Sequence, residues 1–403
     1  MKRRVFLTGT FDVENYGDLL FPLIARQRLA ALGVDVLPVS PTTTTTRFAD
    51  AIAPIAVPDM FDPEVQAEGV VIGGGYIIHS QSGDFLDAYR EAGLGRHAYP
   101  SLWIGATIAA AIRDIPAMWN APGAVVPFPR SRRETTVASV LRAADYVSVR
   151  DPGSLVFLDP PRDVTAVVTP DTAAGLAELW SAKELDSAFY ALIERKGGDP
   201  DNAFWSIHLR LRSLGDMAIE ELAAAIDRVA RSMALRPLLV AIGPSLGDGD
   251  AARHLAERLD TSPIVLDDPQ TLIEMTAAIR GSRLYTGASF HGYVAAAAFG
   301  VPAIVVARPA HRKFDGFVTQ IGRPQDMARS WTDALAMAEA RPPERDGTMI
   351  PPAVTEAVRL HWERIADCLD HPERRREERA RLLRTVVGSG VRVGGIDWAL
   401  ATL

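Results

Sequence analysis

One histidine stands out among the residues that could do chemistry. His291 follows the apolar run from Leu284 to Gly287 and opens an alanine-rich segment that ends at Gly300. This spacing predicts a short strand, a turn at Ser289 and a helix that carries His291 in its first turn. The first amide groups of a helix are free, and the helix dipole is positive there. We therefore predict an anion site at His291, with a satisfied core histidine as the alternative.

Basic residues follow other predicted strands. His208, Arg210 and Arg212 alternate along FWSIHLRLRS and so share one face of a strand, and Arg150 ends the strand in DYVSVRDPGS. Arginine at the carboxyl end of a parallel strand can bind a carboxylate or phosphate through two hydrogen bonds. Lys313 lies in the basic loop RPAHRKF, just past another strand. We predict that this set binds an anion; ion pairs between domains and a solvated loop are the alternatives.

The first predicted strand leads into the loop of TGTFDVENYGDLLFPL. Backbone amides of a strand–loop–helix turn face the cleft of an α/β domain, so Asn15, Tyr16 and Gly17 could line a ligand site. Asp18 could cap the helix that follows. Ordinary turn chemistry explains the same residues equally well.

Three consecutive glycines follow the buried strand of VVIGGGYIIHS. Gly74 and Gly75 allow close backbone approach or a positive φ, which suits a turn that lines a cleft. The spacing is not GxGxxG and no acidic residue follows a second strand, which disfavours a nicotinamide cofactor. Asp248 and Asp250 form an Asp-x-Asp pair without a further ligand, so no metal is assigned.

Composition narrows the class of protein. The chain has 403 residues, 48% hydrophobic and 23% charged, with a formal net charge of −7. These values are typical of a globular protein and argue against a nucleic-acid partner. Cys368 is the only cysteine, which excludes an internal disulfide. Apolar runs are too short for a signal peptide or a membrane span. We expect a cytoplasmic protein, either free or peripheral at the inner face of the membrane.

Short apolar runs alternate with helical patterns along most of the chain, which indicates parallel sheets covered on both faces. We predict an α/β fold of two Rossmann-like, doubly wound domains. The predicted units are an N-terminal domain over 1–178, a C-terminal domain over 200–325 and a helical extension over 326–403 that packs back on them. The predicted strands are RVFLTG, VDVLPVS, GVVIGGG, SLWIGA, DYVSVR and VTAVV, then AFWSIHLRL, PLLVAIG, SPIVLDD, SRLYTG and VPAIVVA.

The ordered series of motifs resembles the polysaccharide pyruvyl transferase family over roughly residues 5–320. The series runs through ENYGD, VVIGGGYII, VSVRDPGS, VTPDTAAGL with Asp171, a strand ending at Arg210, TGASFHGYVAAAAFGVPAIVV and Lys313. The resemblance implies a GT-B-like arrangement, phosphoenolpyruvate as donor, a free or lipid-linked saccharide as acceptor and no further cofactor. In this arrangement we place the acceptor on the N-terminal domain and the donor on the C-terminal domain.

Such a reaction needs cationic and N–H donors for the carboxylate and phosphate, and an acid and a base. The candidate acid is His291, and Asp18 and Asp171 are candidates for the base or an acceptor contact. The candidates for binding the donor are Arg210, Ser289, Lys313 and Arg150. The residues expected to line the cleft are Asn15, Tyr16, Gly17, Gly74 and Gly75.

The chain departs from the family pattern at Ser289, where the family usually has an arginine two residues before the histidine. Serine cannot supply a charged bidentate contact, a loss of roughly 1.5–3 kcal/mol. Either another arginine (Arg150, Arg210, Arg212 or Arg308) supplies the missing contact, or the donor substrate of this protein differs from that of the family. The alternatives are a GT-B-like glycosyltransferase that uses a nucleotide sugar, and a non-catalytic member of the family.

Overall fold

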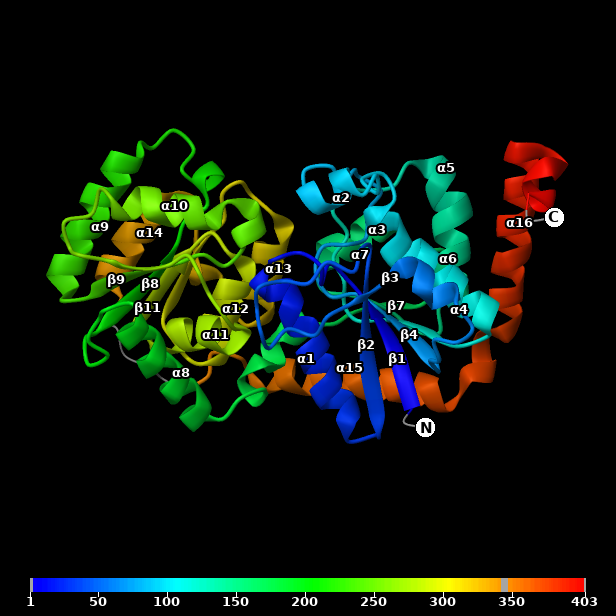
Figure 1. Cartoon of the computed structure of the whole chain (residues 1–403), viewed down its shortest axis with the longest axis horizontal. Coiled ribbons are helices and arrows are strands. Elements are labelled where there is room, and N and C mark those ends of the chain that lie inside the picture. Colours follow the sequence, from blue (N-terminus) through cyan, green and yellow to red (C-terminus); the bar gives the residue numbers. More distant parts are fainter. Residues whose placement is uncertain (1–2, 342–346, 402–403) are drawn as a thin grey trace.

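The computed structural model describes residues 3–341 and 347–401, and it shows two halves, each built on a parallel sheet. In Figure 1 the N-terminal half (blue to cyan) lies beside the C-terminal half (green to yellow). The first sheet has the order β3-β2-β1-β4-β5, and a parallel pair, β6 and β7, continues beside β5 through a bridge between Met118 and Tyr146. The strands are β1 (Arg3–Thr8), β2 (Val34–Ser40), β3 (Ile55–Ala56), β4 (Gly69–Ile72), β5 (Ala117–Trp119), β6 (Val147–Val149) and β7 (Ala166–Val168).

Helices and turns cover this sheet. They are α1 (Tyr16–Ala30), α2 (Asp87–Glu91), α3 (Ala98–Pro100), α4 (Ala106–Arg113), α5 (Arg130–Arg132), α6 (Ala138–Ala143) and α7 (Pro152–Leu158), the π-helical turns η2 (Ser101–Gly105) and η3 (Arg133–Val137), and the 3₁₀ turns η1 (Val57–Phe61) and η4 (Thr172–Glu178).

The predicted strand SLWIGA is wrong. Its residues form η2 and the start of α4, because the alanine-rich segment after them continues a helix that buries Leu102 and Trp103. The strand at this edge of the sheet is instead β5, whose three residues are too few to show a period.

The second sheet has the order β10-β9-β8-β11-β12-β13, and every pair is parallel. Its strands are β8 (Phe204–His208), β9 (Arg236–Val240), β10 (Ile264–Leu266), β11 (Leu284–Gly287), β12 (Ala303–Val306) and β13 (Met327–Ala328). The helices are α8 (Ala182–Arg195), α9 (Ile219–Met233), α10 (Asp248–Ala256), α11 (Leu272–Gly281), α12 (Phe290–Ala298), α13 (Arg312–Gln320) and α14 (Trp331–Ala340), and the 3₁₀ turns are η5 (Leu211–Ser213), η6 (Pro244–Leu246) and η7 (Pro324–Asp326).

Both sheets reverse their strand order at one place. In each, the first strand of the half lies between the second strand and the fourth, so chain segments leave in opposite directions on either side of it. Ligands of doubly wound folds bind outside the carboxyl ends of the strands at this switch point. The segments that follow β1, β4, β8 and β11 are therefore the ones expected to carry a site.

The two halves share a hydrophobic core. One continuous cluster of buried residues includes α1 from the first half and α11 and α12 from the second. The Tyr16 N–H donates to the Ile242 carbonyl at 3.0 Å, and the Asp50 carboxylate accepts from the Leu272 and Ile273 amides at the start of α11, at 2.6 and 3.0 Å. These contacts set the distance between the switch points.

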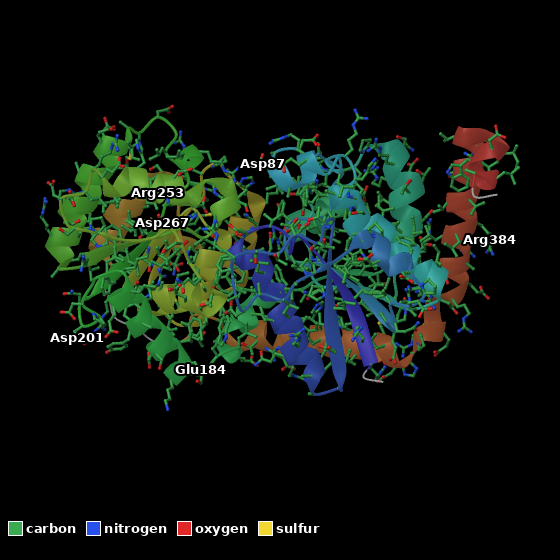
Figure 2. The ribbon with its side chains drawn as sticks, in the orientation of Figure 1. Asp87, Glu184, Asp201, Arg253, Asp267 and Arg384 are labelled. Carbon is green, nitrogen blue, oxygen red and sulfur yellow. The ribbon has the colours of Figure 1, made fainter. Side chains whose placement is uncertain are left out.

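The C-terminal part differs from the predicted extension over 326–403. Strand β13 and helix α14 complete the second half, since α14 packs on α9 and β12. Helix α15 (Pro352–Asp370) then returns along both halves, η8 (Pro372–Arg375) turns the chain, and α16 (Arg376–Leu400) packs on α4 and α6, as Figure 1 shows in orange and red. Figure 2 shows charged side chains, such as Glu184 of α8 and Arg384 of α16, on the outer surface.

Candidate functional site

A cavity of about 540 Å³ lies where the two switch points face each other. The segments that follow β1, β4, β8 and β11 all contribute to its lining, as the topology requires. The residues that line the cavity include Thr10, Asn15 and Asp18 after β1; Gly75 and Tyr76 after β4; Arg150; Arg210 and Arg212 after β8; Asp248; Ser289 and His291 after β11; and Lys313.

His291 faces this cavity from the first turn of α12. Ser289 caps the helix, and its hydroxyl oxygen accepts from the Gly292 N–H at 3.2 Å. The ring packs against Phe21 and Phe290 in edge-to-face contacts, and the residue is 8% exposed. Gly17 makes room for it, because a Cβ there would lie 1.7 Å from Nδ1 of His291. The imidazole and the positive end of α12 thus meet at the cavity.

Asp171 lies behind the histidine. Its Oδ2 is 3.7 Å from Nε2 of His291 and 3.3 Å from Nη1 of Arg150, and its Oδ1 accepts from the Ala173 amide at 3.0 Å as the cap of η4. Burial would raise the pKa of Asp171, but His291 and Arg150 outweigh it and lower that pKa. The carboxylate therefore stays ionised and can stabilise a positive charge on the imidazole.

Arg150 is a buried cation with unused donors. It is 3% exposed, and its guanidinium lies over the rings of Tyr76 and Phe290, 4.3 and 5.1 Å from their centres. Within the described residues Nε and Nη2 make no hydrogen bond, and Nε is 3.8 Å from a carboxylate oxygen of Asp151. A buried donor without a partner is costly, so a ligand anion in the cavity would satisfy this group.

Arg210 is oriented by a buried aspartate. Its Nε and Nη2 lie 3.3 and 3.4 Å from the carboxylate of Asp248, which also accepts from Nε2 of His208 at 2.8 Å and from the Gly243 amide at 2.7 Å. Burial would raise the pKa of Asp248, yet His208 and Arg210 lower it to about 2. The ionised carboxylate holds Arg210 at the cavity, with Arg212 beside it.

Lys313 adds a cation of unusual acidity. Its Nζ lies 5.6 Å from the centre of the Phe290 ring and 5.7 Å from that of Tyr76. Burial, Arg150 and Arg210 lower the pKa of Lys313 to about 7. The ammonium is therefore poised to gain or lose a proton near neutral pH, and a bound anion would favour the charged form.

Asp18 supplies a carboxylate to the same cavity. Its Oδ2 accepts from the Thr10 hydroxyl at 2.9 Å and from the Asn15 amide at 2.8 Å. Its Oδ1 lies close to Gly75, where a Cβ would be 3.0 Å away and where φ is +73°. The carboxylate is fixed by neutral donors and is near the cations, an arrangement suited to accepting a proton from a hydroxyl.

Three residues predicted for the cleft do not line it. Tyr16 is fully buried, and its hydroxyl lies 2.8 Å from the hydroxyl of Thr276, so it joins the two halves. Gly17 acts behind His291, as described above. Gly74 lies under the Phe21 ring, which a Cβ would meet at 2.4 Å. All three are needed for close packing beneath the site.

Other predicted residues also lie outside the cavity lining, and two lining residues were not predicted. Asp171 contacts His291 from outside the cavity lining. Arg308 forms an ion pair with Asp216 at 3.6 Å, and Arg312 lies over the Phe157 ring, so neither belongs to the cavity. Sequence reasoning missed Tyr76, although it directly follows the glycine turn, and Tyr99, for which the sequence carries no comparable marker.

The sequence pattern indicates Asp248 only as half of an Asp-x-Asp pair. In the described residues no cluster of three or more histidine, cysteine, aspartate or glutamate side chains could hold a metal ion. Asp248 instead lies against His208 and Arg210. No helix among the described residues is long and apolar enough to cross a membrane.

Comparisons with known proteins agree with this architecture. The family model described as polysaccharide pyruvyl transferase matches residues 15–309. Among solved structures, the UDP-N-acetylglucosamine 2-epimerase of Rickettsia bellii has a TM-score of 0.57 at 11% identity and covers 93% of this chain and 97% of its own. The UDP-GlcNAc 2-epimerase of Neisseria meningitidis, bound to UDP-GlcNAc, has a TM-score of 0.54 at 11% identity and covers 91% of this chain and 100% of its own.

At such low identities the structural likeness shows the fold alone. That fold is GT-B-like, with two Rossmann-like sheets, which confirms the predicted fold class. No curated protein matches the chain.

Proposed function

The chain belongs to the polysaccharide pyruvyl transferase family, and we propose that it moves a pyruvyl group from phosphoenolpyruvate to two hydroxyls of a saccharide, forming a pyruvate ketal. The acceptor would be a surface or extracellular polysaccharide or its precursor, free or lipid-linked. We place the reaction in the cytoplasm, where phosphoenolpyruvate is available, and the reaction calls for no cofactor beyond this donor.

The cations of the cavity support an anionic donor. Phosphoenolpyruvate carries a carboxylate and a phosphate on one small skeleton, so it needs several cationic donors close together. Arg150, Arg210 and Lys313 line a single cavity with the N-terminus of α12. A charged hydrogen bond contributes roughly 1.5–3 kcal/mol, so two or three of them could hold a small polyanion.

Arg150 offers an answer to the departure at Ser289. Arg150 lines the same cavity as His291, its Nε and Nη2 have no hydrogen-bond partner among the described residues, and its ring contacts keep the guanidinium in place. We propose that Arg150 supplies the donor contact that an arginine at position 289 would otherwise make. The serine hydroxyl, which accepts from Gly292, keeps its own proton available for a phosphate oxygen.

The proposed reaction balances without an oxidant or reductant. One acceptor hydroxyl bonds to the central carbon of the donor and gives its proton to the base, while the methylene carbon of the donor takes up a proton from the acid, so the protein neither gains nor loses a proton overall. The second hydroxyl then bonds to the same carbon, the bond to the phosphate oxygen breaks, and the second hydroxyl proton leaves with the phosphate. His291 is the proposed acid for the methylene carbon, with Asp171 as its positioning residue, and Asp18 is the proposed base for a hydroxyl.

The observation that carries the proposal is the buried guanidinium of Arg150, whose Nε and Nη2 have no hydrogen-bond partner among the described residues. Its removal should weaken phosphoenolpyruvate binding, measured by titration calorimetry without acceptor. We expect Arg150→Gln to weaken binding by about tenfold to a hundredfold, since charged hydrogen bonds are lost. The matched control is Arg312→Gln, an arginine on neighbouring α13 whose side chain lies over Phe157 outside the cavity; it should bind within about twofold of the unaltered protein.

Turnover tests the rest of the proposal. Phosphate release from phosphoenolpyruvate is followed with a panel of glycan acceptors. Release that depends on the acceptor and on His291 would support it. Binding of a nucleotide sugar without any binding of phosphoenolpyruvate would replace it with glycosyl transfer, and binding of neither would favour a non-catalytic member of the family.

A further inference from the structure

A second cavity, of about 620 Å³, lies in the N-terminal half next to the candidate site. We call it the amphipathic cavity because an apolar floor meets a basic rim. Trp103 and Phe128 on the floor are buried and their rings are 5.4 Å apart, and Ile104 adds to them. Arg96 and Arg132 lie on the rim and are exposed.

The rim arginines differ from their neighbours. Arg130 pairs with Glu134 at 2.7 Å, and Arg133 pairs with Asp159 at 3.0 Å. Arg132, between them in the chain, faces the cavity, where its Nη1 donates to the Ser80 hydroxyl at 3.2 Å. Among the described residues neither Arg132 nor Arg96 has a carboxylate within ion-pair distance, so two guanidinium groups at one cavity are free for an anion.

The walls of this cavity have unusual backbone geometry. Both π-helical turns in the described part of the chain, η2 and η3, contribute to it, η2 through Trp103 and Ile104 and η3 through Thr136 and Val137. Single π-helical turns are rare and frequently occur at functional sites. Two of them facing one cavity indicate a built site rather than a surface depression.

The amphipathic cavity shares a wall with the candidate site. The segment from Gly75 to Leu86 lines both: Tyr76 and Leu86 face the candidate site, whereas Ser80 and Ser82 face the second cavity. The next shared element is the turn before η2, where Tyr99 faces the first cavity and its neighbours His97 and Pro100 face the second. A ligand longer than a few sugars could therefore reach from one cavity to the other.

We propose that the amphipathic cavity binds the part of the acceptor that is remote from the reacting hydroxyls. This part would be a phosphate ester that carries an apolar chain. The arginines would bind the phosphate, and the apolar side chains of Pro100, Ile104 and Phe128 would contact the apolar chain. The inference rests on the proposed function only in taking this ligand to be the acceptor.

The probe is n-octyl phosphate, titrated below its micelle concentration into the full chain without phosphoenolpyruvate. The double variant Arg96→Gln/Arg132→Gln should weaken its binding by about tenfold or more, whereas Arg130→Gln should leave it within about twofold. Thr136→Trp, which fills the cavity from an exposed position, should abolish binding; Thr135→Trp, one residue away and outside the lining, should not. Melting temperatures verify that each variant folds.

Four results of this titration and its controls would overturn the assignment. They are no binding of octyl phosphate, equal binding by the Thr136→Trp variant, binding of inorganic phosphate as tight as that of octyl phosphate (an adventitious ion only), and equal binding of uncharged octyl glucoside. Binding that occurs only with phospholipid vesicles would overturn it in favour of a membrane contact. Because the titration omits the donor, failure here leaves the pyruvyl transfer proposal intact, and failure of pyruvyl transfer leaves this binding measurable.

Discussion

Two histidine–aspartate pairs flank the cavity and differ in their spacing and in their access to it. His208 and Asp248 are both fully buried within the C-terminal half, at 2.8 Å, and the aspartate holds Arg210. His291 and Asp171 come from different halves and are 3.7 Å apart, and His291 faces the cavity. The same two residue types thus form an internal support in one place and, in the proposed reaction, an acid that borders the cavity in the other.

The difference shows that access decides the role. A histidine held at hydrogen-bond distance in the core stabilises what it contacts, whereas one held loosely at a cavity can exchange a proton with a ligand.

The largest effect is expected at the accessible pair. His291→Ala should lower kcat for phosphate release by about 10²–10⁴, the usual contribution of a general acid. The melting temperature should change by only a few degrees, because the ring borders the cavity. A large loss of stability with activity retained in the folded fraction would make His291 a core residue and erase the contrast.

The internal pair should respond in the opposite way. His208→Ala leaves the Asp248 carboxylate buried with one partner fewer, and breaking a buried pair costs roughly 3–5 kcal/mol of unfolding free energy. Chemical denaturation measures this loss. An unchanged unfolding free energy would show that the pair does not stabilise the carboxyl end of β8.

Gly17 tests how the accessible ring is positioned. Gly17→Ala places a methyl group where Nδ1 of His291 now lies, so the ring must move. A displacement of about 1 Å can cost about a hundredfold in rate, so kcat should fall by that order. Gly388→Ala, on α16 with open space around it, is the matched control and should leave kcat unchanged.

The pH dependence of donor binding should follow Lys313. The pKa of this group is lowered to about 7, so the ammonium is charged below that pH and neutral above it. Phosphoenolpyruvate affinity should therefore fall as pH rises above 7, by up to about tenfold per pH unit if binding requires the charged form. Lys313→Arg should flatten the profile, because arginine stays charged; identical profiles would remove Lys313 from the donor site.

The smallest effect is expected at Ser289. If Arg150 already makes the donor contact, then Ser289→Arg should improve phosphoenolpyruvate affinity by only a few fold, since the two guanidinium groups repel each other. An improvement of about a hundredfold would instead mean that the donor contact is missing in this chain.

Where local rules apply, sequence reasoning selected residues that line one cavity. His291, Arg210 and Asp18 each follow a strand, and polar residues at the carboxyl ends of parallel strands meet at one edge of a sheet. The strand pattern predicted both sheets for a similar reason, because apolar runs bounded by turns need no knowledge of distant residues.

It failed where packing between distant segments decides. Tyr16 faces Thr276 on α11 rather than the cleft, which depends on how the halves meet. The residues of SLWIGA are apolar enough for a strand, but the turns on both sides are helical. Asp248 is recognisable as a support only once His208 and Arg210 are seen beside it.

The most direct measurement is a crystal structure of the chain soaked with phosphoenolpyruvate. We predict ligand density in the 540 Å³ cavity, with one anionic group at the guanidinium of Arg150 and the other at the start of α12 beside His291. Density elsewhere, or a cavity that stays empty at concentrations that saturate turnover, would contradict it.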